Sequence, residues 1–151
     1  MLKISTRGRY GLRAMLELGL HHGGPPTLLC TISESQDLSK KYLHALLTDL
    51  RSAGLVRSIR GSKGGFMLVR SPEAIDLCEI VAALEGPLSP VDCVEDADVC
   101  DKADGCVVRE VWQDLTDVIQ RHLSGITLAD LLERHRAVSQ QAPPPRSGNA
   151  G

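Results

Sequence analysis

The sequence has no long apolar run and no segment typical of an export signal. No uninterrupted apolar stretch approaches the roughly 20 residues that a membrane-spanning helix needs, and the start, MLKISTRGRYGLRAM, is basic and polar. We therefore expect a soluble, unexported, cytoplasmic protein without a membrane partner. The length of 151 residues suits one compact domain, or a small domain with an appended helical module, and excludes a second large domain.

The sequence also lacks the closely spaced cysteine pairs that zinc fingers and zinc ribbons use. Its five cysteines are an odd number, and without an export signal a framework of disulfides explains them poorly. Metal binding, redox chemistry or packing in a core explains them better, in a compartment that keeps thiols reduced.

The two halves of the chain carry opposite charge. Residues 1–70 hold 11 Lys and Arg against 4 Asp and Glu, a net charge of +7, whereas residues 71–151 hold 6 against 15, a net charge of −9. The first half therefore indicates an anionic partner, although two solvated surfaces could differ in this way by chance. The position of the basic residues has to decide between these readings.

The first half predicts a helix-turn-helix. Apolar residues at helical spacing predict a helix over 10–20, which glycines and prolines end. Thr27 is placed to cap a short second helix over 28–36, and residues 37–39 form a turn in which Ser39 caps the next helix. That third helix ends at Gly54.

The third helix has one apolar and one basic face. Its apolar stripe, which faces the core, consists of Leu43, Leu46, Leu47 and Leu50. The opposite stripe, with two residues near its N-terminal end, consists of Lys41, His44, Thr48, Arg51, Lys40 and Tyr42. Donors and cations gathered in this way suit a helix that enters the major groove of DNA, although an ordinary solvated basic face would look similar.

Two short β-prone runs follow, over 55–60 and 66–70, and five residues from Gly61 to Gly65 separate them. Directly after a helix-turn-helix, such a hairpin is a wing, and its cations are Arg57, Arg60, Lys63 and Arg70. A nucleotide-binding loop is the weaker interpretation, because this loop does not open a helix and lacks the Walker ending. We therefore predict a mainly α fold with a small β-hairpin wing, a winged helix-turn-helix over residues 1–86.

The second half is expected to serve sensing and assembly. A helix over 76–85 precedes an acidic loop over 88–105, and the loop region (87–106) carries Cys93, Cys100 and Cys106. A long C-terminal helix over 107–123 has a broad apolar stripe, which predicts a homodimer, unless the helix packs back on its own domain. A short helix starting at Thr127 completes the region 107–136, and residues 137–151 have a disordered composition.

The three cysteines are separated by six and five residues, a moderate signal for a metal site. Asp104 is a plausible N-cap with Cys106 in the first helical turn, where backbone N–H groups favour a thiolate or an anionic cluster. The surrounding carboxylates would attract a metal cation. Three idle cysteines in an acidic loop are the alternative, which is weaker because cysteine is usually buried unless it reacts or binds metal.

Several motifs carry a resemblance to a known family. The opening KISTRGRYGLRAM, the run LSKKYLHALLTDLRSAGLVRSIRGSKGGFMLVR, the loop CVEDADVCDKADGC, the following VWQDL and the later ITLADLL resemble the iron-sulfur regulators of the IscR, NsrR and CymR type. The likeness covers residues 1–136. It implies a winged-helix dimer held by the long helix, and transcriptional control by an iron-sulfur cluster on Cys93, Cys100 and Cys106. A [2Fe-2S] cluster is favoured and a [4Fe-4S] cluster is possible.

The chain departs from this family at the fourth cluster ligand. IscR has a histidine three residues after the last cysteine, and this chain has Arg109 there, which stays protonated and cannot bind iron. Other members use an acidic residue near the N-terminus, and residues 1–13 contain none. The open candidates are a residue of the partner subunit, a small thiol, Glu95, Asp101 and Asp104. Cys30 and Cys78 are expected in the core, with Cys78 a remote fourth ligand.

These observations predict a DNA-binding transcription regulator, acting as a repressor, and not an enzyme. The residues expected to contact a double-stranded operator are Lys3, Arg7, Ser39, Lys40, Lys41, Tyr42, His44, Thr48, Arg51, Arg57, Arg60, Ser62 and Lys63. Tyr42, His44 and Arg60 are expected to read base edges, and most of the cations to meet phosphate. A regulator that uses the same cysteines as a thiol redox switch or zinc site is the alternative. A metal-dependent enzyme or carrier lacks support, since no nucleophile–base pair or cofactor loop is visible.

Overall fold

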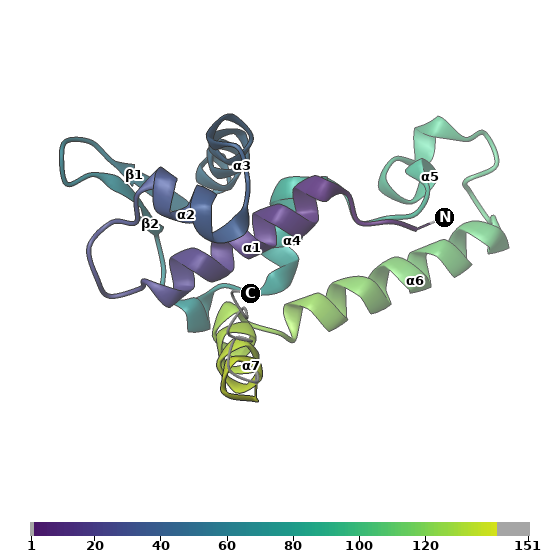
Figure 1. The fold of residues 1–151 in the computed structure, drawn as a ribbon. Coiled ribbons are helices and arrows are strands. Elements are labelled where there is room, and N and C mark those ends of the chain that lie inside the picture. Colours follow the sequence, from purple (N-terminus) through teal and green to yellow (C-terminus); the bar gives the residue numbers. More distant parts are fainter. Residues whose placement is uncertain (1, 142–151) are drawn as a thin grey trace, which may run out of the picture.

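The computed structural model describes residues 2–141, which form a helical domain with one hairpin and one projecting helix (Figure 1). The elements are α1 (Thr6–Leu20), α2 (Leu29–Gln36), α3 (Lys40–Ser52), β1 (Val56–Ile59), β2 (Gly65–Leu68), the 3-10 turn η1 (Pro72–Ala74), α4 (Leu77–Glu85), α5 (Asp92–Glu95), the 3-10 turn η2 (Ala97–Val99), α6 (Val107–Ser124) and α7 (Leu128–Gln141).

The predicted helix-turn-helix is α2 and α3. Ser39 caps α3 as expected, because its side chain accepts a hydrogen bond from the backbone N–H of Tyr42. The turn before it uses Asp37, whose φ of 52° places it in the left-handed region. The predicted cap at Thr27 is wrong: Leu28 is the N-cap residue of α2, without a side-chain hydrogen bond.

Thr27 cannot cap α2 because its backbone belongs to the hairpin. The N–H and C=O of Thr27 pair with Phe66, both at 2.8 Å, beside the antiparallel strands β1 and β2. Gly65 makes this approach possible, because a Cβ there would lie 2.4 Å from the carbonyl oxygen of Thr27, and its φ of +153° disfavours any side chain. The hairpin is therefore fastened to the start of α2.

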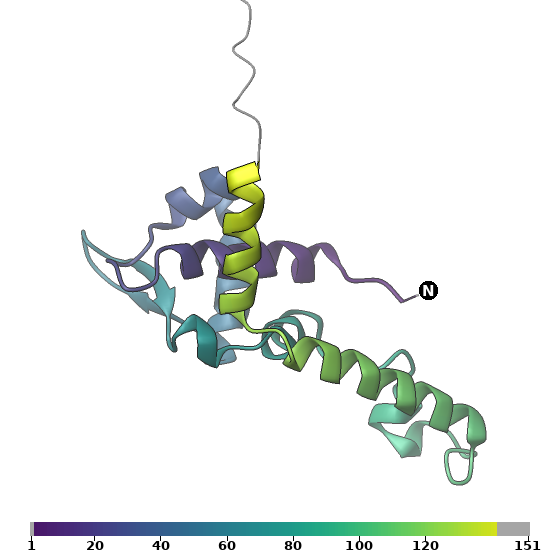
Figure 2. The same cartoon turned by 90° about the horizontal axis from the view of Figure 1, so that it is seen from below.

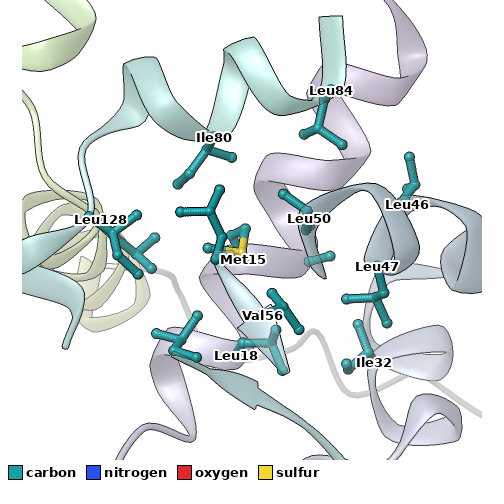
Figure 3. Packing of buried hydrophobic residues seen from close by; sticks show 14 of the residues in the cluster. Met15, Leu18, Ile32, Leu46, Leu47, Leu50, Val56, Ile80, Leu84 and Leu128 are labelled. Carbon is teal, nitrogen blue, oxygen red and sulfur yellow. The ribbon is translucent and has the colours of Figure 1, made fainter. Parts of the chain in front are cut away.

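The core lies between α1, α3 and α4, with α2, α7 and the hairpin at its sides (Figure 3). The predicted apolar stripe of α3 is confirmed, since Leu43, Leu46, Leu47 and Leu50 are fully buried. The stripe packs against α1 and α4. This burial leaves the opposite, polar face of α3 to solvent.

Helix α1 begins at Thr6, four residues before the predicted Tyr10, because Ser5 caps it by accepting a hydrogen bond from the N–H of Gly8. The expected loop over 88–105 contains the short helical turns α5 and η2. The predicted cap at Asp104 is also wrong: Cys106 takes the N-cap position of α6, without a side-chain hydrogen bond.

Helix α6 projects away from the domain, and α7 returns to pack across α1 and η1 (Figure 2). Thr127 and Asp130 form a reciprocal cap at the start of α7, as expected from the sequence. The hydrogen bond from the backbone N–H of Thr127 lowers the pKa of Asp130. Helix α7 continues to Gln141, five residues beyond the expected end, and the remainder of the predicted tail lies outside the described residues.

Candidate functional site

A basic surface covers the outer side of α3. Lys40, Lys41 and His44 are exposed on the first half of the helix. Arg51, near its end, is also exposed, and its Nη1 donates a hydrogen bond to the Oγ of Ser58 on β1, 3.3 Å away. This contact joins the second half of the helix to the hairpin.

The hairpin extends this surface. Arg57, Arg60, Ser62 and Lys63 are all exposed on the strand and the tip, and β1 packs against α3. The ring of His44 lies edge-on to Phe66 of β2, with centroids 6.4 Å apart. We call the exposed residues of α3 and the hairpin the basic face, which consists of Lys40, Lys41, His44, Arg51, Arg57, Arg60, Ser62 and Lys63.

Tyr42 is not part of the basic face. Its hydroxyl is the one buried side-chain polar atom of residues 2–141 without a hydrogen-bond partner, and its ring packs edge-on against Tyr10, with centroids 6.3 Å apart. The structure therefore does not support the expectation that Tyr42 reads a base edge. Thr48 is half-buried, and its hydroxyl donates to the carbonyl of His44 at 2.8 Å.

The two DNA contacts predicted before and within the first turn of α1, Lys3 and Arg7, lie in different places. Arg7 forms an ion pair with Asp49 of α3, so it lies beside the basic face. Lys3 instead lines a cavity with residues of α6. The guanidinium of Arg70 is held away from the hairpin cations, because it bonds Glu79 and the carbonyl of Ala74. The hydrogen bond with Glu79 raises the pKa of Arg70.

The residue-by-residue prediction missed two arginines of α1. Arg9 and Arg13 are exposed, and their guanidinium carbons lie 5.9 and 5.5 Å from the ring centroid of Tyr10. Because Tyr10 contacts Tyr42, these cations lie close to the first turn of α3. The spacing of four residues and the basic charge of the first half are the sequence signals that could have identified them.

The cysteine segment, residues 93–106, lies at the end of α6 that is far from α3 and the hairpin (Figures 1 and 2). Cys93 and Cys106 are half-buried and Cys100 is exposed, and all three are free thiols. Within residues 2–141, no three His, Cys, Asp or Glu side chains are grouped so that they could hold a metal ion. Arg109, where the family's histidine would stand, donates from its Nε to the carbonyl oxygen of Cys93 at 2.6 Å.

Helix α6 leaves several apolar side chains exposed along its length, which we call its exposed stripe. Only Thr116 is fully buried among its 18 residues, whereas Val107, Val108, Val111 and Val118 are each more than half exposed. A largely apolar cavity of about 500 Å³ lies between the second half of α6, residues 2–4 and residues 85–89. None of the helices between residues 2 and 141 has the length and apolar character needed to cross a membrane.

Known proteins share this architecture and sequence. Residues 4–134 match the Rrf2 family, described as "Iron-dependent Transcriptional regulator". The chain is 45% identical over 130 residues to the HTH-type transcriptional regulator CymR of Bacillus subtilis. The alignment covers 86% of this chain and 89% of that protein.

Two solved structures are similar over most of their length. The structure of CymR, the global cysteine regulator of B. subtilis, has a TM-score of 0.72 at 46% identity and covers 89% of this chain and 98% of that one. The T. potens IscR has a TM-score of 0.73 at 40% identity and covers 94% of this chain and 93% of that one. The predicted fold and the expectation of a regulator are confirmed. The chain therefore belongs to the Rrf2 family of DNA-binding transcriptional regulators.

Proposed function

We propose that the chain binds a double-stranded DNA operator through the basic face and represses transcription as a homodimer. The observation that carries this proposal is that the exposed cations of α3 and of the hairpin adjoin one another, while the apolar side of α3 is buried. An α-helix fits the major groove of B-DNA, and a flanking wing reaches the adjacent backbone or minor groove.

The two parts of the basic face have different tasks in this proposal. The first half of α3 presents Lys40, Lys41 and His44 to the major groove, with His44 reading a base edge. Arg57 and Lys63 of the hairpin contact phosphates, and Arg60 reads a base edge. The helix is held beside the wing by the hydrogen bond between Arg51 and Ser58, which keeps the two elements in register.

The exposed stripe of α6 supports the homodimer. A second copy covering this stripe would bury the valines that a single chain leaves in water, and two-fold symmetry would place two copies of α3 on a palindromic operator. The apolar cavity beside the stripe would be enclosed by the same contact. In this proposal residues 1–86 bind DNA and residues 107–136 hold the dimer.

We further propose that operator affinity is controlled by an iron-sulfur cluster held by Cys93, Cys100 and Cys106. Three thiols within one short segment are a suitable donor set, since thiolates are the usual ligands of such clusters. The description of the family as iron-dependent supports this choice. The thiols are not grouped for metal in the described structure, so the segment must rearrange to hold a cluster. The fourth ligand is open, because Arg109 cannot supply it.

A thiol redox switch or a zinc site on the same cysteines is the alternative. Arg109 favours it, because a guanidinium stands where a fourth iron ligand is expected and is already bonded to the backbone of Cys93. The role of the similar B. subtilis protein, a global cysteine regulator, also suits control by thiol chemistry.

Anaerobic purification with iron and sulfide analysis distinguishes the iron-sulfur cluster from the redox switch or zinc site. A brown protein that contains both elements, and loses both when Cys93, Cys100 and Cys106 are replaced together by Ala, supports the cluster. The matched control replaces Cys30 and Cys78, which lie outside the segment, and should keep the iron. A colourless wild-type protein that contains zinc, or no metal, supports the alternative.

The DNA proposal is tested with duplexes that the wild-type protein selects from a random-sequence library. Lys41→Ala and Arg60→Ala should each weaken binding to a selected duplex, while circular dichroism shows an unchanged fold. Arg70→Ala is the matched control, because this cation is occupied by Glu79. Undiminished binding by both basic-face variants would refute the proposed face.

A further inference from the structure

Glu85, the last residue of α4, caps the start of a distant helix. Its Oε1 accepts three hydrogen bonds: from the backbone N–H of Ser5 at 3.0 Å, from the Oγ of Ser5 at 2.6 Å, and from the backbone N–H of Gly8 at 3.0 Å. Backbone N–H groups in the first turn of a helix have no partner within the helix, and a carboxylate there also complements the helix dipole. One half-buried side chain thus holds the first turn of α1 against α4.

Gly8 makes this contact possible. A Cβ at position 8 would lie 2.2 Å from Oε1 of Glu85, so any other residue would displace the carboxylate. Glycine is a poor helix former, and its presence in the first turn of α1 is explained by the approach of Glu85.

The turn that Glu85 holds is also joined to the DNA-binding helix. Arg7, between the two bonded residues Ser5 and Gly8, forms an ion pair with Asp49 of α3. The contacts therefore run from Glu85 through the first turn of α1 to α3 without interruption. On its other side, Glu85 is followed by Gly86 and Pro87, which lead into the cysteine segment.

We propose that Glu85 is a positioning residue for DNA binding: by holding the first turn of α1, it sets the place of α3 and its basic face. The residue touches no DNA in this arrangement and acts through Arg7 and Asp49. This inference rests on the proposed function, because it assumes that α3 is the helix that enters the major groove.

The experiment compares three substitutions on a duplex selected by the wild-type protein and on a scrambled duplex of equal length. Glu85→Ala removes the acceptor and should lower affinity for the selected duplex by about 5-fold or more, the lower end of usual coupling between sites. Affinity for the scrambled duplex should stay unchanged, because phosphate contacts carry it. Glu85→Gln should restore binding, since all three bonds end on one oxygen, which an amide oxygen can replace.

Gly8→Ala tests the same contact without changing Glu85. The added Cβ should displace the carboxylate and reproduce the loss of affinity for the selected duplex. Hydrogen exchange at the amides of Ser5 and Gly8 should quicken in both damaging variants, as a direct record of the broken cap. The matched control is Glu79→Ala, on the same helix, because Glu79 bonds Arg70 instead of α1.

The outcomes separate this inference from the proposed function. If folded Glu85→Ala and Gly8→Ala bind the selected duplex as the wild type does, Glu85 does not position α3. Should Glu85→Ala fail to fold, Gly8→Ala decides in its place. If Lys41→Ala and Arg60→Ala weaken binding while the Glu85 and Gly8 variants do not, only the positioning role is refuted. If none of them weakens binding, the basic face itself is wrong.

Discussion

Removing one cation from the hairpin should change the salt dependence of DNA binding by a definite amount. Arg51 of the basic face donates a hydrogen bond to Ser58. The other five exposed cations of this face have neither an ion pair nor a side-chain hydrogen bond within residues 2–141: Lys40, Lys41, Arg57, Arg60 and Lys63. Each phosphate neutralised on B-DNA contributes about −0.9 to the slope of log K against log salt concentration. On a scrambled duplex Arg60 has no specific base edge to read, so each of the five cations is taken to meet one phosphate. The slope is then about −4.5 for one protomer and about −9 for a dimer.

Lys63→Ala removes one of these contacts from each protomer. The slope should flatten by about 0.9 per protomer and so by about 1.8 for a dimer, with the same preference among sequences. Fluorescence anisotropy with a labelled scrambled duplex, between about 50 and 200 mM salt, covers the range in which such contacts change affinity strongly. The fold should be unaffected, because Lys63 is exposed at the hairpin tip.

Arg70→Ala is the matched control, since it also removes a cation close to the hairpin. Arg70 is engaged by Glu79 and by the carbonyl of Ala74, so the slope should remain that of the wild type. Binding that does not depend on salt would refute the contact between the basic face and the DNA backbone. Equal flattening by Lys63→Ala and Arg70→Ala would show that net charge, and not this face, drives binding.

Three further predictions concern assembly and stability. Val118→Asp places a charge on the exposed stripe of α6 and should shift a dimer toward monomer in analytical ultracentrifugation; sedimentation like that of the wild type would place the interface elsewhere. Leu47→Ala empties a fully buried position and should lower the free energy of unfolding by about 2–5 kcal/mol in denaturant titrations, and a negligible loss would contradict the described core. Because the pKa of Asp130 is lowered in the folded state, its cap stabilises α7 above the ordinary pKa of about 3.8 and is lost as pH falls through the folded-state pKa. Asp130→Ala should therefore lower the melting temperature at neutral pH, the difference closing in acid, and a difference that persists at low pH would exclude this cause.

The candidate site could be predicted from sequence where local pattern determines it. The leucine stripe of α3 identifies the opposite face as exposed, and the placement of Lys41 and His44 follows from it. The pattern could not show that the Tyr42 hydroxyl is buried or that Lys3 lies beside α6. Those placements depend on segments that come together only in the folded chain.

The sequence by itself determined the elements whose signals are local. Helical periodicity, the cap at Ser39 and the glycine-rich hairpin tip each act within a few residues, so α3 and the hairpin follow from the amino-acid sequence. Only the tertiary structure decided which groups distant in the sequence bond to one another. The backbone of Thr27 pairs with Phe66, so Thr27 does not cap α2 as expected. Arg109 bonds the backbone of Cys93. Glu85 caps a turn 77 residues away in the sequence. Local spacing contains no record of such contacts, because they form only when buried apolar faces have brought distant segments together.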